Sequence, residues 1–185
     1  EINQLDEKKI KQLYDWCDYF EIDLMFSIIS ENAFKLIKKF KPNKIKIASR
    51  TLKDNFKLAE KITNLNIETY VSLGMWKNKL KLPFKKRKNL NFLWCKSKYP
   101  TLLHDLKNFP KTFIDKEING YSDHAIGIEM ALLAISRGAE IIEKHFTLDK
   151  SDTSIRDHAL SATPDEFLLL TKIGRDINKK ILLNI

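Results

Sequence analysis

Two histidines, His124 and His145, are the residues whose type and spacing most clearly suggest chemistry in this sequence. They are separated by 21 residues, about the length of one strand, one helix and a loop. At this spacing they would emerge at equivalent heights on neighbouring parallel strands, where two imidazoles could hold one divalent metal ion and leave positions open for substrate. Either histidine alone is better explained as structural, whereas for the pair the two interpretations are evenly balanced.

Polar side chains follow nearly every apolar stretch that could form a strand. In parallel α/β folds the binding residues lie at the carboxyl ends of the strands. These ends carry, in chain order, Ser27, Lys46, Ser49, Ser72, Lys96, Ser97, Tyr99, Ser122, Asp123, His124, Glu143, Lys144 and His145. A serine at a strand end is usually a turn or cap residue, so each one taken alone is weak evidence for a ligand.

The elements that must position these residues alternate between short apolar strands and helices. Strands are predicted at 22–29, 45–49, 67–72, 91–95, 118–122 and 140–145. Helices are predicted at 5–17, 32–40, 54–62 and 127–138, and a last one begins after Thr163 as N-cap with Pro164 at its first position. The segment 74–91 is irregular, with a short or absent helix. Apolar strands separated by helices are typical of a parallel sheet covered on both faces, so an α/β fold of about six βα units is expected.

Length and composition indicate a single globular domain over residues 1–185. Hydrophobic residues make up 43% of the chain and aromatic residues 10%, which is enough for a buried core and excludes a disordered chain. No apolar run approaches the roughly 20 residues of a membrane-spanning helix, and the first ten residues lack the profile of a secretory signal. We therefore expect a cytoplasmic protein without a membrane partner.

The formal net charge of +9 originates in one part of the chain. Between Glu68 and Asp105 there are nine basic residues and no acidic one, with most of the positive charge from Lys77 to Lys88. Such a run is most often a solvated loop, and a basic anion-binding module is the alternative. Because lysine greatly outnumbers arginine, the composition argues against nucleic acid as a partner.

Three motifs extend this interpretation beyond residue types. They are GYSDHAIGIE at 120–129, IIEKHFTLDK at 141–150 and RDHALSATPDEF at 156–167. They closely resemble the sialic acid synthase family, the phosphoenolpyruvate-dependent synthases of N-acetylneuraminate and other nonulosonic acids. The stretches KIAS, VSLGM and LWCKSKYP resemble the ends of earlier strands in the same family, so the resemblance covers nearly the whole chain.

The resemblance implies a (β/α)8 TIM barrel that is incomplete in this chain. The N-terminal strands would be missing, and no C-terminal antifreeze-like domain would follow. His124 and His145 would bind a divalent metal ion, Mn²⁺ with Mg²⁺ or Co²⁺ as alternatives, and together with Lys46 they would be the catalytic residues. The substrate-binding residues that the resemblance implies are Ser49 beside Lys46 at phosphoenolpyruvate, further hydroxyls from Ser27, Ser72, Ser97 and Ser122, and Tyr99 and Asp157 facing the sugar.

The implied activity is that of a transferase that forms a C–C bond. It would condense phosphoenolpyruvate with an N-acetylmannosamine-like aldehyde sugar to a nonulosonic acid and phosphate, and a homodimer is left open. Where the family commonly has SG followed by an acidic residue, this chain has Arg50 and Thr51. A non-catalytic homologue that binds sugar or phosphate on the same barrel is therefore an alternative, beside the basic anion-binding module.

Overall fold

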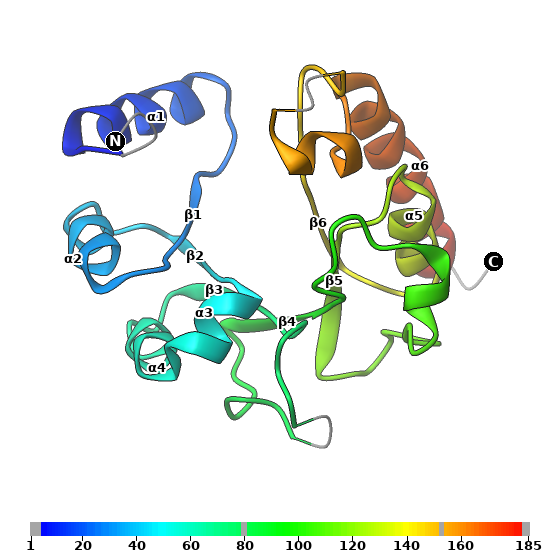
Figure 1. The fold of residues 1–185 in the computed structure, drawn as a ribbon, viewed down its shortest axis with the longest axis horizontal. Coiled ribbons are helices and arrows are strands. Elements are labelled where there is room, and N and C mark those ends of the chain that lie inside the picture. Colours follow the sequence, from blue (N-terminus) through cyan, green and yellow to red (C-terminus); the bar gives the residue numbers. More distant parts are fainter. Residues whose placement is uncertain (1–4, 79–80, 152–153, 183–185) are drawn as a thin grey trace.

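Six parallel strands form the centre of the computed structural model, which describes residues 5–78, 81–151 and 154–182 (Figure 1). The strands are β1 (Met25–Ser27), β2 (Lys44–Ile47), β3 (Glu68–Ser72), β4 (Leu90–Cys95), β5 (Ile118–Asp123) and β6 (Ile141–Lys144). They lie side by side in chain order, and every neighbouring pair is parallel. The prediction of an α/β fold with about six parallel βα units is confirmed.

Helices lie on the outer side of the curved sheet (Figure 1). They are α1 (Glu7–Tyr19), α2 (Glu31–Lys39), α3 (Ser49–Asp54), α4 (Phe56–Thr63), α5 (Glu129–Ser136) and α6 (Pro164–Leu182), with 3-10 turns η1 (Leu103–Leu106) and η2 (Arg156–Leu160). Within the described ranges, no helix combines the length and the apolar character needed to cross a membrane. The described part of the β3–β4 connection contains no helix, as the irregular sequence there predicts.

The predicted start of the helix at 54–62 is wrong, because two helices occupy this region. The first, α3, ends at Asp54, and the second, α4, begins at Phe56. Asn55 separates them, and its side-chain oxygen accepts a hydrogen bond from the backbone N–H of Leu58 at 3.1 Å. An asparagine that caps a new helix gives the backbone an alternative to continuing the old one.

The main core lies between the first four strands and their helices. Ile45, Val71 and Phe92 from the sheet have no exposed surface, and neither do Leu58 and Ile62 from α4. A second cluster lies under α5 and is built around Tyr121 of β5. Because apolar residues fill the space between sheet and helices, the strand ends are left for polar side chains.

Phe92→Ala is expected to lower the free energy of unfolding by about 3–5 kcal/mol, because it opens a cavity in the centre of the sheet. Urea unfolding followed by circular dichroism measures the change. The control is Leu103→Ala, whose side chain is 78% exposed and whose removal should alter stability by no more than about 0.5 kcal/mol. An unchanged midpoint for Phe92→Ala would show that β4 does not lie where the structure places it.

The sheet curves into a half-barrel, so that β1 and β6 face each other across its open side (Figure 1). Each of these two strands has one strand neighbour in the described chain. Apolar side chains are exposed near both, with Met25 at 40% and Ile29 at 70% beside β1, and Phe146 at 54% and Leu148 at 82% after β6. The curvature turns the carboxyl ends of all six strands toward a common centre.

Candidate active site

A polar cavity of about 240 Å³ lies at the carboxyl ends of the strands, and all six strands contribute to it. Its wall is made by Ser27, Lys46, Ala48, Ser49, Ser72, Cys95, Tyr99, Ser122, Asp123, His124, Glu143, Lys144 and His145. All the predicted site residues except Ser97 and Asp157 belong to this wall. The structure therefore brings together side chains that the sequence connects only through their position at strand ends.

The two predicted metal ligands are neighbours in this cavity. The centres of the His124 and His145 rings lie 5.4 Å apart, with an angle of 50° between the ring planes. The parallel register of β5 and β6 pairs Asp123 with Lys144, which places the two histidines at equivalent heights. Two imidazoles at this separation can direct one nitrogen each toward a shared ion.

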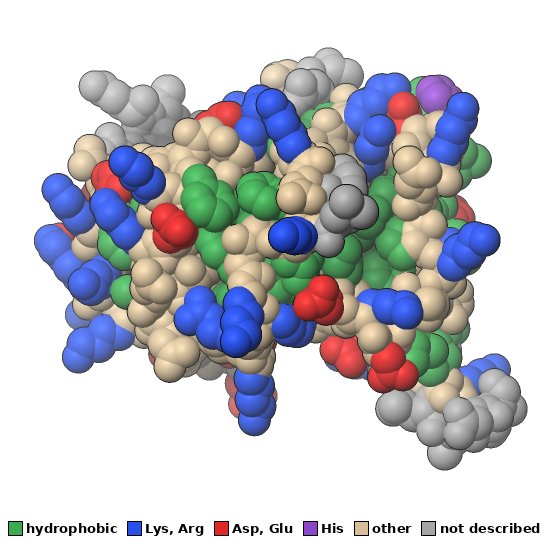
Figure 2. Space-filling model, turned by 90° about the horizontal axis from the view of Figure 1, so that it is seen from below, with side chains coloured by type: hydrophobic (Ala, Val, Ile, Leu, Met, Phe, Trp, Pro, Cys, Tyr) green, Lys and Arg blue, Asp and Glu red, His purple; other side chains and the backbone are tan. Residues whose placement is uncertain are grey.

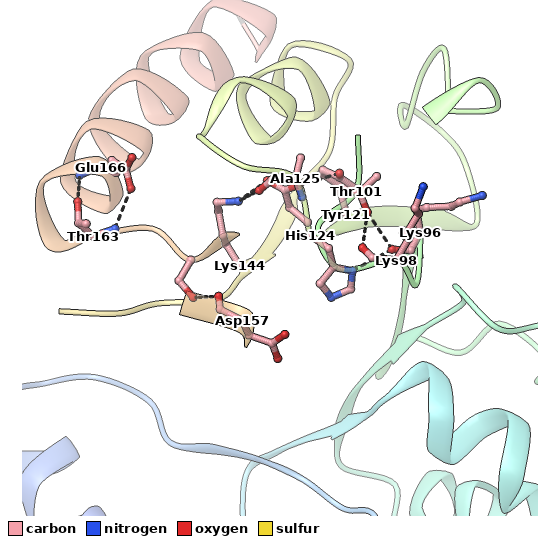
Figure 3. A network of polar contacts seen from close by, with 12 residues as sticks. Lys96, Lys98, Thr101, Tyr121, His124, Ala125, Lys144, Asp157, Thr163 and Glu166 are labelled. Atoms are coloured by element: carbon pink, nitrogen blue, oxygen red, sulfur yellow. Dashed lines mark hydrogen bonds and ion pairs between the residues drawn. The ribbon is translucent and has the colours of Figure 1, made fainter. Parts of the chain in front are cut away.

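The orientation of His124 is fixed by a backbone carbonyl (Figure 3). Its Nδ1 lies 3.0 Å from the carbonyl oxygen of Lys96. Since a carbonyl oxygen can only accept, Nδ1 carries the hydrogen and Nε2 is the unprotonated nitrogen. A second ring nitrogen held in this way is typical of histidines that bind metal.

The protonation state of His124 also suits a metal ligand. Burial lowers the pKa of its imidazole below the ordinary value, despite the opposing hydrogen bond to the Lys96 carbonyl. The ring is therefore neutral at pH 7, as ligation requires. In the described part of the chain, no group of three or more histidine, cysteine or acidic side chains is arranged around one point. Two imidazoles are one ligand fewer than the three protein ligands of a typical catalytic zinc site, so water or substrate would have to complete the coordination of a bound ion.

A buried lysine faces the cavity from the opposite strand. Lys46 is 5% exposed, and its Nζ donates to both carboxylate oxygens of Glu143, at 2.6 and 2.7 Å. The Ser72 hydroxyl donates to the same carboxylate at 3.4 Å. Burial raises the pKa of Glu143, but the charge and hydrogen bonds of Lys46 outweigh it and hold this pKa below its usual range. The sequence marks Glu143 only as a polar residue at a strand end and predicts no role for it.

The two residues predicted to face the sugar are placed differently. The Tyr99 ring lies against both imidazoles, with its centre 4.2 Å from that of His124 and 6.1 Å from that of His145. Asp157 is the second residue of η2 and does not belong to the cavity wall. Its backbone carbonyl accepts a hydrogen bond from the Ser161 hydroxyl at 2.7 Å. In Figure 3 the Asp157 carboxylate and the His124 imidazole extend toward the same side of the view. The sugar-binding role of both residues stays a prediction.

Ser97 is not one of the residues that form the cavity wall. Its hydroxyl is 3.8 Å from the Sγ of Cys95, which itself lies 3.8 Å from the Ser49 hydroxyl. The Ser49 hydroxyl accepts a hydrogen bond from the backbone N–H of Gly74 at 3.0 Å. Burial raises the pKa of the Cys95 thiol, so the sulfur is protonated at neutral pH and is a weak metal ligand.

Gly74→Ala is expected to weaken binding of phosphoenolpyruvate, the ligand that the sequence resemblance implies, by about tenfold or more. A Cβ at this position would lie 2.3 Å from the Ser97 hydroxyl and 2.8 Å from the Cys95 sulfur, so the hydroxyls around it must move. Titration calorimetry measures the Kd. Gly174→Ala in α6, which lies outside the wall, is the control, and equal affinity of the two variants would contradict the expected crowding.

The departure at Arg50 and Thr51 has a local structural reason. Thr51 is 4% exposed, and its hydroxyl donates to the backbone carbonyl of Ile28 at 3.2 Å. This hydrogen bond joins α3 to the segment just after β1. Thr51 therefore holds two elements together at the position where an acidic residue is expected from the family resemblance.

The family model described as the NeuB family matches residues 1–182 of this chain. An N-acetylneuraminate-9-phosphate synthase of Drosophila melanogaster is 31% identical, over 86% of this chain and 45% of its own length. A pseudaminic acid synthase of Campylobacter jejuni is 34% identical, over 81% of this chain and 49% of its own length. The chain thus spans about half the length of these curated relatives.

A solved structure agrees with these sequence relatives. The N-acetylneuraminic acid (sialic acid) synthetase of Leptospira borgpetersenii serovar Hardjo-bovis, crystallised in complex with citrate, superposes with a TM-score of 0.83 at 28% identity. The match covers 96% of this chain and 65% of that one. Fold and sequence motifs agree over almost the whole length, and the chain belongs to the NeuB family.

Proposed function

We propose that the protein is a transferase that joins phosphoenolpyruvate to the aldehyde of an N-acetylmannosamine-like sugar, giving a nonulosonic acid and phosphate. The proposal is supported by relatives named as synthases of N-acetylneuraminate 9-phosphate and of pseudaminic acid. The observation that carries it is one cavity in which a buried lysine, several buried hydroxyls and two adjacent imidazoles meet. These groups suit an anion and an aldehyde bound side by side.

The bonds in this reaction balance without an oxidant or a reductant. The terminal methylene carbon of phosphoenolpyruvate forms a C–C bond with the aldehyde carbon of the sugar, whose oxygen takes up a proton. Water then adds at the adjacent carbon that carries the phosphate, and phosphate leaves as the C–O bond to that carbon breaks, which leaves a ketone there. The residues of this chain have to bind a multiply charged anion, orient the sugar and move protons.

Lys46 is the residue suited to the anion. Its ammonium is nearly removed from water, so a phosphate or carboxylate bound to it gains a strong charge-assisted hydrogen bond. The hydroxyls of Ser49, Ser72 and Ser122 are buried beside it and can add further donors. Without a bound anion, the Lys46 ammonium is paired with the Glu143 carboxylate, so an anionic ligand would compete with this carboxylate for Lys46.

His124 and His145 would hold the divalent ion, which the family resemblance gives as Mn²⁺. When bound, such an ion would draw electron density from the aldehyde oxygen of the sugar. The Tyr99 ring packs against both imidazoles and limits where the sugar can lie. The choice among N-acetylmannosamine and its deoxy or diacetamido relatives then depends on groups that contact the sugar outside this wall.

Phosphate release from phosphoenolpyruvate tests the proposal. The protein is incubated with Mn²⁺, phosphoenolpyruvate and either N-acetylmannosamine or a diacetamido sugar, and inorganic phosphate is measured with a colorimetric assay. We expect release that needs both metal and sugar and stops on addition of EDTA. Metal-loaded protein that releases no phosphate with any of these sugars would contradict the proposed reaction.

A binding protein without turnover is the second candidate, and Thr51 favours it. Its hydroxyl is committed to the Ile28 carbonyl, so this position offers no carboxylate for proton handling. Titration calorimetry separates the two functions, because a binding homologue would take up phosphoenolpyruvate without releasing phosphate. Recovery of phosphate release in Thr51→Glu would identify the missing carboxylate as the reason.

The basic segment receives less support as an anion-binding module. The Nζ of Lys86 donates to the backbone carbonyls of Leu90 and Glu117, at 3.0 and 3.3 Å, and Arg87 donates to the carbonyl of Thr63 at 3.1 Å. These two charges anchor the loop to the sheet and to α4. Figure 2 shows the molecule from below relative to Figure 1. On that face, lysine and arginine side chains are dispersed among apolar and acidic ones and do not form one patch.

A further inference from the structure

We propose that the ion pair between Asp123 and Lys144 positions the two imidazoles of the metal site. The inference rests on the proposed function, because it concerns the same pair of histidines. The Nζ of Lys144 lies 2.9 Å from Oδ2 of Asp123, and neither side chain has any exposed surface. Each member directly precedes one of the histidines in the chain, so the ion pair links the backbones that carry His124 and His145.

The ion pair is held in one geometry by further hydrogen bonds. Oδ1 of Asp123 accepts from the Tyr121 hydroxyl and from the backbone N–H of Ala125, both at 2.8 Å. The Nζ of Lys144 also donates to the carbonyl oxygen of Ala125 at 2.8 Å (Figure 3). A fully buried ion pair is tolerated when its remaining donors and acceptors find partners, as they do here, and it then admits few alternative arrangements.

The strand ladder stops just before the histidines. Asp123 and Lys144 are the last residues of β5 and β6, and they form the last paired position in the register. After this position, the segments that follow β5 and β6 are not paired with each other as strands. The side-chain ion pair is therefore the cross-link closest to the point where the imidazoles leave the sheet.

The two charges act on the site through the backbone and not by contact with a ligand. Asp123 and Lys144 border the cavity, yet the absence of exposed side-chain surface keeps both charged groups from any bound molecule. In Figure 3 the Lys144 side chain and the His124 ring extend in different directions. Asp123 and Lys144 are positioning residues.

The affinity for a metal ion depends on how firmly the protein holds its two ligands at the right spacing. If one imidazole becomes mobile, metal binding has to order it again, and the affinity falls. Groups that orient metal ligands typically change metal affinity by about 10–100-fold when they are removed. Loss of the cross-link should therefore weaken Mn²⁺ binding and alter the coordination geometry, even though both histidines remain.

The test replaces both charges at once. Asp123→Asn combined with Lys144→Met leaves no unpaired buried charge, and the asparagine oxygen can still accept from Tyr121 and Ala125. The Kd for Mn²⁺ is measured from the electron paramagnetic resonance signal of the free ion, and the visible spectrum of bound Co²⁺ reports the coordination geometry. We expect at least about a tenfold higher Kd and a changed Co²⁺ spectrum.

Two controls separate positioning from general stability. Phe92→Ala removes core packing at a residue outside the cavity wall and should keep the Kd for Mn²⁺, although it lowers the urea midpoint. Lys150→Met breaks an ion pair with Glu166, which also lies in the β6–α6 region, and should keep the Kd too. If the double variant does not fold, Asp123→Glu, which keeps both charges and shifts the carboxylate by one methylene group, is measured in the same way.

An unchanged Kd and Co²⁺ spectrum in the folded double variant would overturn the proposal, as would a Kd change in Phe92→Ala of the same size. Absence of Mn²⁺ binding by the unmodified protein would overturn it as well. Failure of the proposed reaction gives a different result: Mn²⁺ binding that depends on the histidines and on the ion pair, without phosphate release. That result would support the positioning role and contradict the transferase.

Discussion

His145→Ala is expected to abolish tight Mn²⁺ binding while the protein stays folded and soluble. The variant removes one of the two imidazoles that the structure places 5.4 Å apart. Changes to groups behind a ligand cost about 10–100-fold in metal affinity, so loss of the ligand itself should exceed 100-fold. The metal content after gel filtration, measured by atomic emission, reports the loss. His124→Ala should behave in the same way.

The matched control is His104→Ala. His104 lies in η1, its side chain is 68% exposed, and it takes no part in the cavity. It should retain the Mn²⁺ content of the unmodified protein, which excludes a general effect of losing one histidine. Unchanged content in either His124→Ala or His145→Ala would refute the assignment of the metal ligands. Circular dichroism confirms in each case that the variant is folded.

Much of the fold follows from the sequence because apolar strands in a parallel sheet are short, continuous and separated by helices. The spacing of His124 and His145 fixes their register, since one βα unit returns the chain to the same height on the next strand. The cap at Thr163 is also local: Thr163 and Glu166 exchange hydrogen bonds at 2.9 and 3.4 Å at the start of α6. Each of these features depends on residues that are near one another in the chain.

The features that the sequence did not indicate depend on the curvature of the sheet. Lys46 and Glu143 are 97 residues apart and meet because β2 and β6 face each other across the half-barrel. The pair of Asp123 and Lys144 was visible only as two charged strand ends, and nothing in the sequence distinguishes a buried charge from an exposed one. The same limit applies to Ser97, which is not part of the cavity wall although it follows a strand.

Curvature also explains why the site is polar while its surroundings are not. At the carboxyl ends of the six strands the last residues converge on one cavity. Lysine, serine and histidine can therefore be buried there against each other instead of against hydrocarbon. Their hydrogen bonds compensate for the loss of water, and the same bonds are the ones that a charged ligand must replace.

Lys46→Met is expected to raise the Kd for phosphoenolpyruvate by roughly 10–100-fold. A hydrogen bond to a charged group contributes about 1.5–3 kcal/mol, and the 5% exposure of Lys46 places this bond out of reach of bulk water. The variant also leaves the Glu143 carboxylate without its ammonium partner and facing the anion. Titration calorimetry with phosphoenolpyruvate measures the affinity, and urea unfolding measures the cost of the unpaired charge.

Combining Lys46→Met with Glu143→Gln separates these two effects. The double variant has no unpaired charge, so its urea midpoint should return toward that of the unmodified protein. Its affinity for phosphoenolpyruvate should recover only the part that was lost to repulsion by Glu143, because the ammonium donor is still missing. Full recovery of affinity would show that Lys46 serves only to neutralise Glu143, and that the phosphate binds elsewhere. A persistent loss would assign the anion to Lys46 itself.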